Sequence, residues 1–352
     1  RLRVKEHKFQ IGVQVLGAII DADRSGAGYA DLAEAALGSL LPAVWDAFAD
    51  AERHGMIDRG AMVILAMGKF GSREMTGESD LDLIFVYDYP DDDSVSDGAR
   101  SLPAQQYFTR LSQRLINALT VPTAEGKLYE VDMRLRPSGN SGPVATRFNG
   151  FADYQRNDAW TWEHMALTRA RVVAGEAELA ARVRETMTEV LCRPRGRERT
   201  VEDVAAMRQR LIRQRGSDNP WEMKMVRGGL LDIEFIAQFL QLSHAADTPK
   251  VLNPNMCAAL SNLARAGHLS QPDVDSLITA SGLYRDLMAL FRVSVEGEFD
   301  PGEAPRGMVN AVLRISEATD LEQLQRRLVE TQAEVLAIFE RIVTAAADTV
   351  QQ

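Results

Sequence analysis

Cysteine, long apolar runs and excess positive charge are all scarce in this sequence. Among 352 residues there are only two cysteines, Cys192 and Cys257, which are too few and too far apart to suggest a disulfide framework or a zinc site. A reducing compartment is the simplest interpretation of this cysteine usage. No apolar run is long enough to cross a bilayer, and no secretory signal peptide is evident. We therefore expect a cytoplasmic protein without a membrane partner.

The charge balance is acidic, with a net charge of −10 at pH 7. Broad nucleic-acid binding depends on a basic surface, so we expect no nucleic-acid partner, although a local basic pocket is compatible with this balance. A hydrophobic fraction of 45% and a charged fraction of 26% are typical of a globular protein with a packed core. The chain has neither the Walker A spacing nor a G-x-G-x-x-G sequence after a strand, which argues against P-loop and Rossmann sites.

The hydrophobic periodicity changes along the chain. The first 55 residues have helical spacing, with a break expected at 25–28. Strand signals fall between about 60 and 150, on either side of an amphipathic helix expected over 105–119. The rest of the chain has a helical period almost throughout, and its last long helix is expected over about 320–348. We predict an α+β fold with three domains, namely an N-terminal helical segment (1–55), a sheet domain (56–150) and a helical bundle domain (151–352).

Two acidic residues lie one residue apart at the start of an apolar segment. Asp80 and Asp82 follow a turn rich in glycine and serine and precede the Leu-Ile-Phe-Val run 83–86. Alternate residues of a strand face the same way, so we expect both carboxylates on one face. Two carboxylates directed at one point repel each other unless a cation lies between them, and Mg²⁺ prefers hard oxygen ligands. We predict that both residues bind a divalent metal; the alternative is a surface turn with capping acids.

A third carboxylate lies in the segment 128–136, which alternates polar and apolar residues as a half-buried strand does. The expected polar face of this strand carries Glu130, Asp132, Arg134 and Arg136. Next to the first acidic strand, Asp132 would supply a third metal ligand, and Arg134 and Arg136 would contact phosphate or nucleotide. Two metals held by shared carboxylates stabilise both oxygens of a phosphoryl-type displacement. The alternative for Asp132 is an ion pair with one of the two arginines.

The segment just before the first acids fits the same chemistry. A buried strand is expected over 62–67, followed by the sequence Gly-Lys-Phe-Gly-Ser at 68–72. Small residues let the backbone approach a phosphate, free N–H groups can cradle it, and a lysine adds positive charge. We predict a nucleotide-binding loop here that continues to the residue before the acids, with the contacts made by Gly68, Lys69, Gly71, Ser72 and Ser79.

These motifs resemble a known family. The segment 68–72 followed by Ser-Asp-Leu-Asp-Leu at 79–83 resembles the nucleotidyltransferase signature, in which a Gly-Ser turn precedes an Asp-x-Asp strand. More narrowly, the sequence resembles the bifunctional glutamine synthetase adenylyltransferase/adenylyl-removing enzymes, which carry two related nucleotidyltransferase halves. Glu130 and Asp232, within Glu-Val-Asp and Asp-Ile-Glu-Phe, resemble the C-terminal adenylylating half. The other stretches that carry the resemblance are 128–132, 136–139, 160–164, 169–173 and 228–235.

The resemblance implies a fold and a reaction. The fold is a nucleotidyltransferase sheet domain with flanking helices and a C-terminal helical bundle. The reaction is the transfer of AMP from ATP, with Mg²⁺, to a tyrosine of glutamine synthetase, and Asp80, Asp82 and Asp132 are the implied catalytic residues. Either Asp132 removes the tyrosine proton as a general base or the metal lowers the pKa of the hydroxyl. Because the chain begins at Arg1, we expect a fragment of a longer protein that a nitrogen-regulatory signal protein controls through the missing part.

Several alternatives stay open on the sequence alone. The chain can instead remove AMP from glutamine synthetase by phosphorolysis, act on RNA as a nucleotidyltransferase, or bind nucleotide as a non-catalytic regulator. A helix beginning at 160–164 either buries Trp160 and Trp162 in the core or borders the active cleft, with Glu163, Arg169 or Arg171 facing that cleft. Asp232 and Glu234 either complement a helix dipole or contact a substrate.

Overall fold

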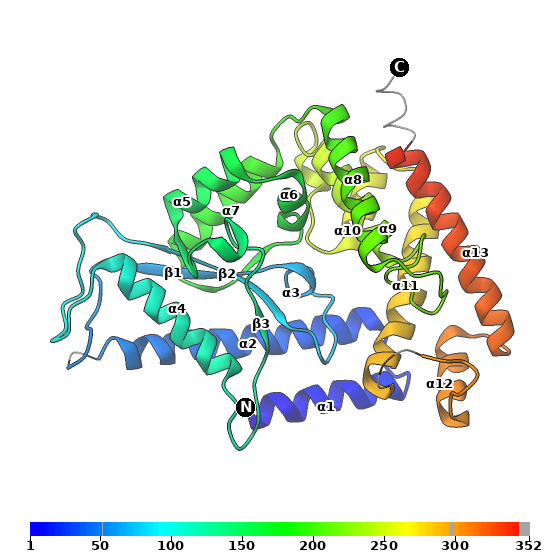
Figure 1. The fold of residues 1–352 in the computed structure, drawn as a ribbon, viewed down its shortest axis with the longest axis horizontal. Coiled ribbons are helices and arrows are strands. Elements are labelled where there is room, and N and C mark those ends of the chain that lie inside the picture. The colour runs from blue at the N-terminus through cyan, green and yellow to red at the C-terminus, as the bar shows by residue number, and fades with distance from the viewer. Residues whose placement is uncertain (51, 296, 298, 345–352) are drawn as a thin grey trace. The chain divides into compact units, whose positions relative to one another are not determined.

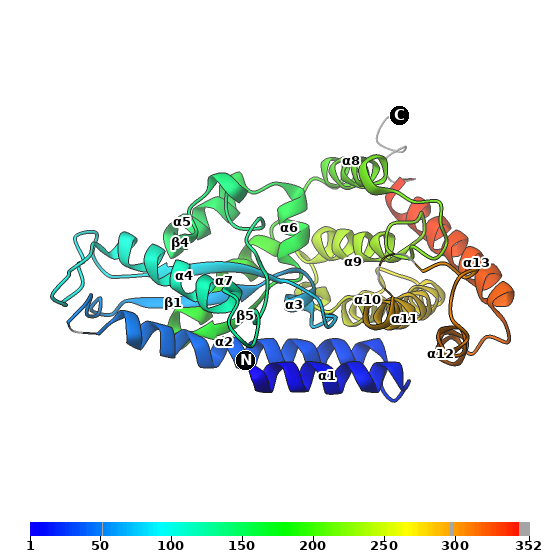
Figure 2. The ribbon, with the colours of Figure 1, turned by 60° about the horizontal axis from the view of Figure 1, so that its bottom comes forward.

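The computed structural model describes residues 1–50, 52–295, 297 and 299–344, and the chain divides into two compact units. The sheet unit consists of Arg1–Phe9, Gly28–Met75 and Ser79–Val190. The helical unit consists of Gln10–Ala27, Thr76–Glu78 and Leu191–Gln352. Figures 1 and 2 label the helices α1–α13 of both units and the strands of the sheet unit. The α+β class and the nucleotidyltransferase-like arrangement are confirmed, whereas the expected three-domain division at residues 55 and 150 stays a prediction.

The sheet has five strands among the described residues, and β2 pairs with three of the others. The order β3-β2-β1-β5 places β1 between two antiparallel neighbours, while β3 and β4 pair in parallel with successive parts of β2. The strands are β1 (Ala61–Ala66), β2 (Leu81–Asp88), β3 (Val131–Asp132), β4 (Ala145–Arg147) and β5 (Arg171–Gly175). β1 and β2 are buried almost throughout, as continuous apolar runs in central strands usually are.

Helices supply the rest of the core of the sheet unit. The expected amphipathic helix is α4 (Ala104–Thr120), which buries Tyr107, Phe108 and Leu111 completely. The ring of Phe108 stacks on Tyr87 of β2 at 4.8 Å, so the helix is held against the sheet by its aromatic stripe. The other helices of this unit are α3 (Gly68–Ser72), α5 (Phe148–Asp153), a π-helical turn (Tyr154–Asp158), α6 (Thr161–Leu167) and α7 (Ala177–Leu191).

The N-terminal helices are α1 (Leu2–Leu16) and α2 (Ala22–Phe48), which Figure 2 shows side by side. The break expected at residues 25–28 is wrong, because α2 continues through this segment and the chain turns earlier, at 17–21. Asp21 accepts a hydrogen bond from the backbone N–H of Arg24 at 2.8 Å, which starts the helix. Glycine disfavours a helix by about 1 kcal/mol, and the packing of a helix against its neighbours outweighs such a cost.

Two other expectations about strands are wrong. The strand expected over 128–136 ends at Asp132, because the Asp132 carboxylate accepts the backbone N–H of Arg134 at 2.8 Å and the chain turns there. Glu130, Arg134 and Arg136 therefore do not share a strand face with Asp132. Strand β5 falls in the part of the chain expected to be helical, and it forms by antiparallel pairing with β1, which is distant in sequence.

The helical unit confirms the expected C-terminal bundle. Helix α9 lies in its centre and contacts α8, α10, α11 and α13. The helices are α8 (Arg197–Arg215), α9 (Leu230–His244), α10 (Met256–Arg265), α11 (Gln271–Ser294), α12 (Arg306–Ser316) and α13 (Leu321–Phe339), with a 3₁₀ turn at Pro249–Val251 and a π-helical turn at Glu340–Thr344. The last helix was expected to reach residue 348, and 345–348 lie outside the described residues. No helix in the described part of the chain has the length and apolar character needed to span a membrane.

Candidate metal and nucleotide site

The pairing of β2 with β3 brings the acidic residues together. The two strands run parallel, with Asp82 directly opposite Asp132, and Asp80 comes just before β2 begins. Each of the three residues offers one carboxylate oxygen, and these oxygens all lie within 4.8 Å of one another. Asp80 is exposed, whereas Asp82 and Asp132 are half-buried, so the cluster opens to solvent on one side. The predicted proximity is found, and metal binding by these residues stays a prediction.

The surroundings of Asp82 disfavour the ionised form of its carboxylate. Burial raises the pKa of Asp82 to about 6, and the negative charges of Asp80 and Asp132 add to the rise. Arg169 and Arg134 act in the opposite direction but do not cancel it. A divalent cation among these oxygens would relieve the repulsion, so the donor set fits Mg²⁺, a hard cation that prefers carboxylates.

Asp132 has a different environment from Asp82, because Arg134 lies against it. The Nε atom of Arg134 donates to the Asp132 carboxylate at 2.7 Å, and the hydrogen bonds and charge of this arginine lower the pKa of Asp132. The Arg134 side chain is 70% exposed. The ion pair that was the alternative for Asp132 is therefore present, and it coexists with the approach of Asp132 to the other two acids.

The segment expected to be a nucleotide-binding loop folds as the short helix α3, which follows β1 directly. Gly68 has a φ of +52°, and a Cβ atom there would overlap the carboxylate of Asp82. A Cβ atom at Gly71 would overlap the backbone carbonyl oxygen of Arg169. Both glycines are thus required by close packing, the first of them against an acid of the cluster. Lys69 lies between them on α3, and Ser79 is half-buried next to Asp80.

A buried polar network supports α3 from within the sheet unit. The Ser72 hydroxyl donates to the Glu74 carboxylate at 2.8 Å, and Arg169 donates to both residues at 2.8 Å. All three side chains are largely shielded from solvent. Ser72 therefore faces this network in the structure. Glu74 is a member of this network that was not expected from the sequence, where its only signal is an acidic side chain two residues after Ser72.

Other residues singled out in the sequence have structural partners. Arg136 donates to the carbonyl oxygens of Met133 at 2.8 Å and Gly142 at 3.3 Å, which organises the turn after β3. Arg171 forms an ion pair with Glu34 at 2.6 Å. A nucleotide bound by Arg136 would compete with these two carbonyl oxygens for the hydrogen bonds of its guanidinium.

The start of α6 was expected to hold core tryptophans or to border the cleft. Trp160 is 69% exposed, so the core interpretation of this residue is wrong. Glu163 is buried and accepts hydrogen bonds from the Trp160 backbone N–H at 2.9 Å and the Tyr154 hydroxyl at 2.8 Å. This carboxylate caps the helix, and the partners it already has account for its burial. His164 contacts the carbonyl oxygen of Gln155 at 3.0 Å.

Comparison with known proteins identifies the family. The model of the glutamate-ammonia ligase adenylyltransferase family matches residues 1–186, more than half of the chain. The chain belongs to this family. The model of a second family, GlnD PII-uridylyltransferase, matches residues 200–296.

Curated relatives agree with this assignment along the whole chain. An enzyme from Rhodopseudomonas palustris is 45% identical over 97% of this chain, one from Xanthobacter autotrophicus is 45% identical over 99%, and one from Bradyrhizobium diazoefficiens is 43% identical over 97%. All three are named bifunctional glutamine synthetase adenylyltransferase/adenylyl-removing enzyme. The aligned part is only 34–35% of these relatives, so the chain spans about a third of the length of each of them.

Proposed function

We propose that this chain transfers AMP from ATP to a tyrosine of glutamine synthetase and releases pyrophosphate. The observation that carries the proposal is the convergence of three carboxylates from β2, its preceding residue and β3 in a member of the adenylyltransferase family. The names of the relatives support glutamine synthetase as the acceptor, since each includes adenylyltransferase activity on that protein.

The roles of the site residues follow from their surroundings. Asp80, Asp82 and Asp132 would hold Mg²⁺, which when bound would neutralise charge on the phosphate oxygens. Arg134 is exposed beside Asp132, so its guanidinium can reach a phosphate from the edge of the cluster. Gly68 keeps space open for the Asp82 carboxylate, and Lys69 adds positive charge on α3. These assignments, with Gly71, Ser72, Ser79 and Arg136 as further nucleotide contacts, are proposals.

The ion pair of Asp132 bears on whether this residue acts as a metal ligand or as a general base. Arg134 lowers the pKa of Asp132, which favours the ionised carboxylate that a metal ligand needs. A lowered pKa also makes a carboxylate a weaker base, because its proton affinity falls. The arrangement therefore supports Asp132 as a ligand more than as the group that removes the tyrosine proton.

The deciding experiment uses the chain itself with ATP, MgCl₂ and unmodified glutamine synthetase. We expect the mass of the synthetase subunit to rise by one adenylyl group, and pyrophosphate to appear in equal amount. Asp82→Asn should abolish the rise, whereas Asp93→Asn, which removes a carboxylate from an exposed loop, should leave it unchanged. An unmodified synthetase mass with the wild-type chain would refute the proposal.

Phosphorolytic removal of AMP is the second candidate, because the relatives' names include an adenylyl-removing activity. The two reactions are separated by offering adenylylated glutamine synthetase with inorganic phosphate and MgCl₂. Release of ADP from this mixture, without modification of the unmodified synthetase in the first assay, would assign the chain to the removing reaction.

The proposal includes regulation by a nitrogen-regulatory signal protein. The match of residues 200–296 to a PII-uridylyltransferase model supports a connection to a nitrogen-regulatory signal protein. Because this chain spans about a third of its relatives' length, the proposal places the action of that protein in the parts of the relatives that this chain does not span. Cysteine usage supports a cytoplasmic location. Adding purified PII protein should therefore change the transfer rate of a full-length relative and leave the rate of this chain unchanged.

A further inference from the structure

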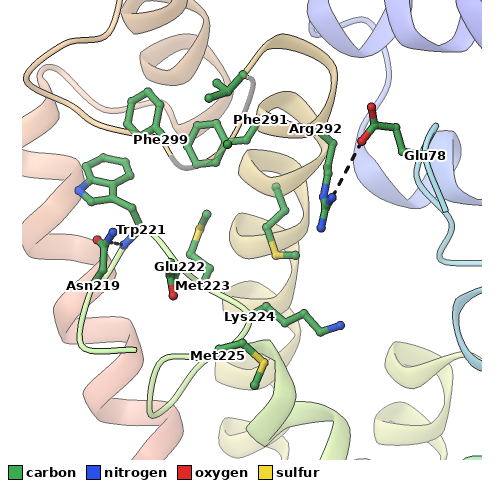
Figure 3. Close-up of a pocket in the computed structure, with 13 residues that line it drawn as sticks. Glu78, Asn219, Trp221, Glu222, Met223, Lys224, Met225, Phe291, Arg292 and Phe299 are labelled. Carbon is green, nitrogen blue, oxygen red and sulfur yellow. Dashed lines mark hydrogen bonds and ion pairs between the residues drawn. The ribbon is translucent and has the colours of Figure 1, made fainter. Parts of the chain in front are cut away.

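A pocket of about 570 Å³ lies within the helical unit, and its lining includes none of the three acids of the cluster (Figure 3). Its walls come from the turn before α9, from the C-terminal end of α11 and the residues after it, and from Glu78. The volume is within the range of small-molecule sites.

One side of the pocket is an aromatic wall. The rings of Phe291 and Phe299 stack with a centroid separation of 4.4 Å and an interplanar angle of 10°. Trp221 packs against Phe299 at 5.0 Å, and both of these residues are buried. Stacked, rigid rings present a flat apolar surface, which suits a ligand that carries a flat ring. Three methionine side chains complete this part of the lining, and their polarisable, flexible chains adapt to a ring edge.

The opposite side carries two cations. Figure 3 shows the ends of the Lys224 and Arg292 side chains on the same side of the pocket, away from Trp221. Arg292 contacts Glu78 at 4.0 Å, the outer limit of an ion pair, and the two side chains are 55% and 70% exposed. An exposed pair at this distance contributes little to stability, so an anion from solution can replace Glu78 at low cost.

We propose that this pocket binds a small organic anion that carries a flat ring. The ring lies against Phe291, Phe299 and Trp221, and the anionic group lies between Lys224 and Arg292 in place of the Glu78 carboxylate. Glu222 also lines the pocket, and its negative charge disfavours ligands with several anionic groups. The proposal is independent of the proposed transfer reaction, because none of the lining residues belongs to the predicted metal or nucleotide contacts.

The experiment is isothermal titration calorimetry of the whole chain with three probes. The probe 2-naphthoate has a ring and a negative charge, 2-naphthamide has the ring alone, and acetate has the charge alone. We expect 2-naphthoate to bind about tenfold or more tightly than either of the others, since a charge-assisted hydrogen bond distinguishes it. Asp82→Asn should leave this affinity unchanged, which separates the pocket from the acidic cluster.

Different variants of the pocket should change the affinity for 2-naphthoate in opposite directions. Lys224→Gln and Arg292→Gln should each weaken 2-naphthoate by about tenfold without changing 2-naphthamide, and Phe299→Leu should weaken both probes. Glu78→Gln should tighten 2-naphthoate, because it removes the competing carboxylate. The matched control is Arg326→Gln, which removes an arginine of similar exposure paired with Glu322 on the surface of the same unit.

Three results would each overturn the proposal. They are equal affinity for 2-naphthoate and 2-naphthamide, equal weakening by Arg326→Gln and Arg292→Gln, and no effect or a weakening by Glu78→Gln. Thermal unfolding of each variant identifies any loss that comes from misfolding, and Glu78→Gln keeps the test decisive because a gain of affinity cannot come from an unfolded chain.

Discussion

Asp82 of the sheet unit and Asp232 of the helical unit both follow glycine-containing turns, yet their electrostatic surroundings are opposite. Asp232 is 1% exposed and accepts two hydrogen bonds from Arg208, at 2.6 and 2.5 Å, and one from the backbone N–H of Gly228 at 2.6 Å. Asp82 has two other carboxylates beside it, and its pKa is raised to about 6 by burial and by those charges. The negative charge of Asp232 is therefore paired with an arginine inside the fold, whereas that of Asp82 lies beside two further negative charges.

This difference separates structural acids from candidate ligand-binding acids. A buried charge that is fully paired holds segments together, and it has no capacity left for a ligand. A cluster with excess charge makes the folded state less stable by itself and gains from a cation. Asp232 was open to interpretation as a substrate contact or a helix-dipole acid. It lies in the first turn of α9, as the second interpretation expects, and it also joins α9 to α8 through its ion pair with Arg208.

The largest expected effect is on activity, and it tests the unbalanced cluster. Asp80→Asn or Asp82→Asn removes one oxygen ligand of the predicted metal site. We expect AMP transfer to fall by about a thousandfold or more, because metal-assisted charge neutralisation supplies several kcal/mol. The readout is the rate of adenylylation of glutamine synthetase at saturating ATP. Asp232→Asn at a temperature where it stays folded should retain far more activity, and equal losses in both would remove the distinction between the two acids.

The next effect is on stability, and it tests the balanced pair. Arg208→Met leaves the buried Asp232 carboxylate with only the Gly228 N–H as a partner. We expect the free energy of unfolding of the helical unit to fall by about 3–5 kcal/mol, the range for breaking a buried ion pair. Urea unfolding followed by circular dichroism measures it. The double variant Arg208→Met with Asp232→Leu should recover much of the loss, and a double variant as unstable as the single one would show that the buried charge is not the cause.

The third effect is a gain in stability from a mutation in the candidate site, where a loss is the usual result. The pKa of Asp82 is raised from 3.8 to about 6, so the folded state holds its proton more tightly than the unfolded state. The stability cost of ionising Asp82 is therefore absent below about pH 4, grows as the pH rises to 6, and is full above that. At pH 8 with EDTA, Asp82→Asn should raise the free energy of unfolding by up to about 3 kcal/mol.

Chemical unfolding at pH 4 and pH 8 measures this prediction. The stabilisation should disappear at pH 4, where wild-type Asp82 is protonated. Adding MgCl₂ at pH 8 should stabilise the wild-type chain and have a smaller effect on the variant. Equal stability of the two proteins at pH 8 without metal would contradict the raised pKa.

The acidic cluster was predictable from the sequence because its signals are local. A continuous apolar run with acids at its start predicts both β2 and the common face of Asp80 and Asp82. The spacing of Phe108, Leu111, Leu115 and Leu119 predicts α4. The proximity of Asp132 needed only the correct pairing of two strands.

The features that escaped prediction depend on contacts between distant residues or on single hydrogen bonds. Strand β5 exists because β1 offers an unpaired edge about a hundred residues earlier in the chain. The early end of β3 results from one side-chain hydrogen bond by Asp132, which the alternation of residues around it does not reveal. The partner of Asp232 is 24 residues away on another helix, so no local pattern identifies it.

The smallest expected effect concerns Arg134, the arginine that lies against Asp132. Arg134→Gln removes an exposed partner of Asp132, so its stability cost should be at most about 1 kcal/mol. If Arg134 also contacts a phosphate of ATP, the KM for ATP should rise by about tenfold, because a charged hydrogen bond to the substrate is lost. Steady-state kinetics with varied ATP measures the change.

Lys127→Gln is the matched control, since Lys127 forms an exposed ion pair with Glu130 just before β3 and is not part of the cluster. It should leave the KM for ATP unchanged at the same small cost in stability. A KM that rises equally in both variants would mean that the general positive charge near β3 matters, whereas a KM unchanged in Arg134→Gln would leave Arg134 with only its effect on Asp132. In that case the nucleotide would be held by the metal and α3 without Arg134. The difference between the acidic cluster and Asp232 would then come from the neighbouring carboxylates of Asp82 and not from an arginine that binds ATP.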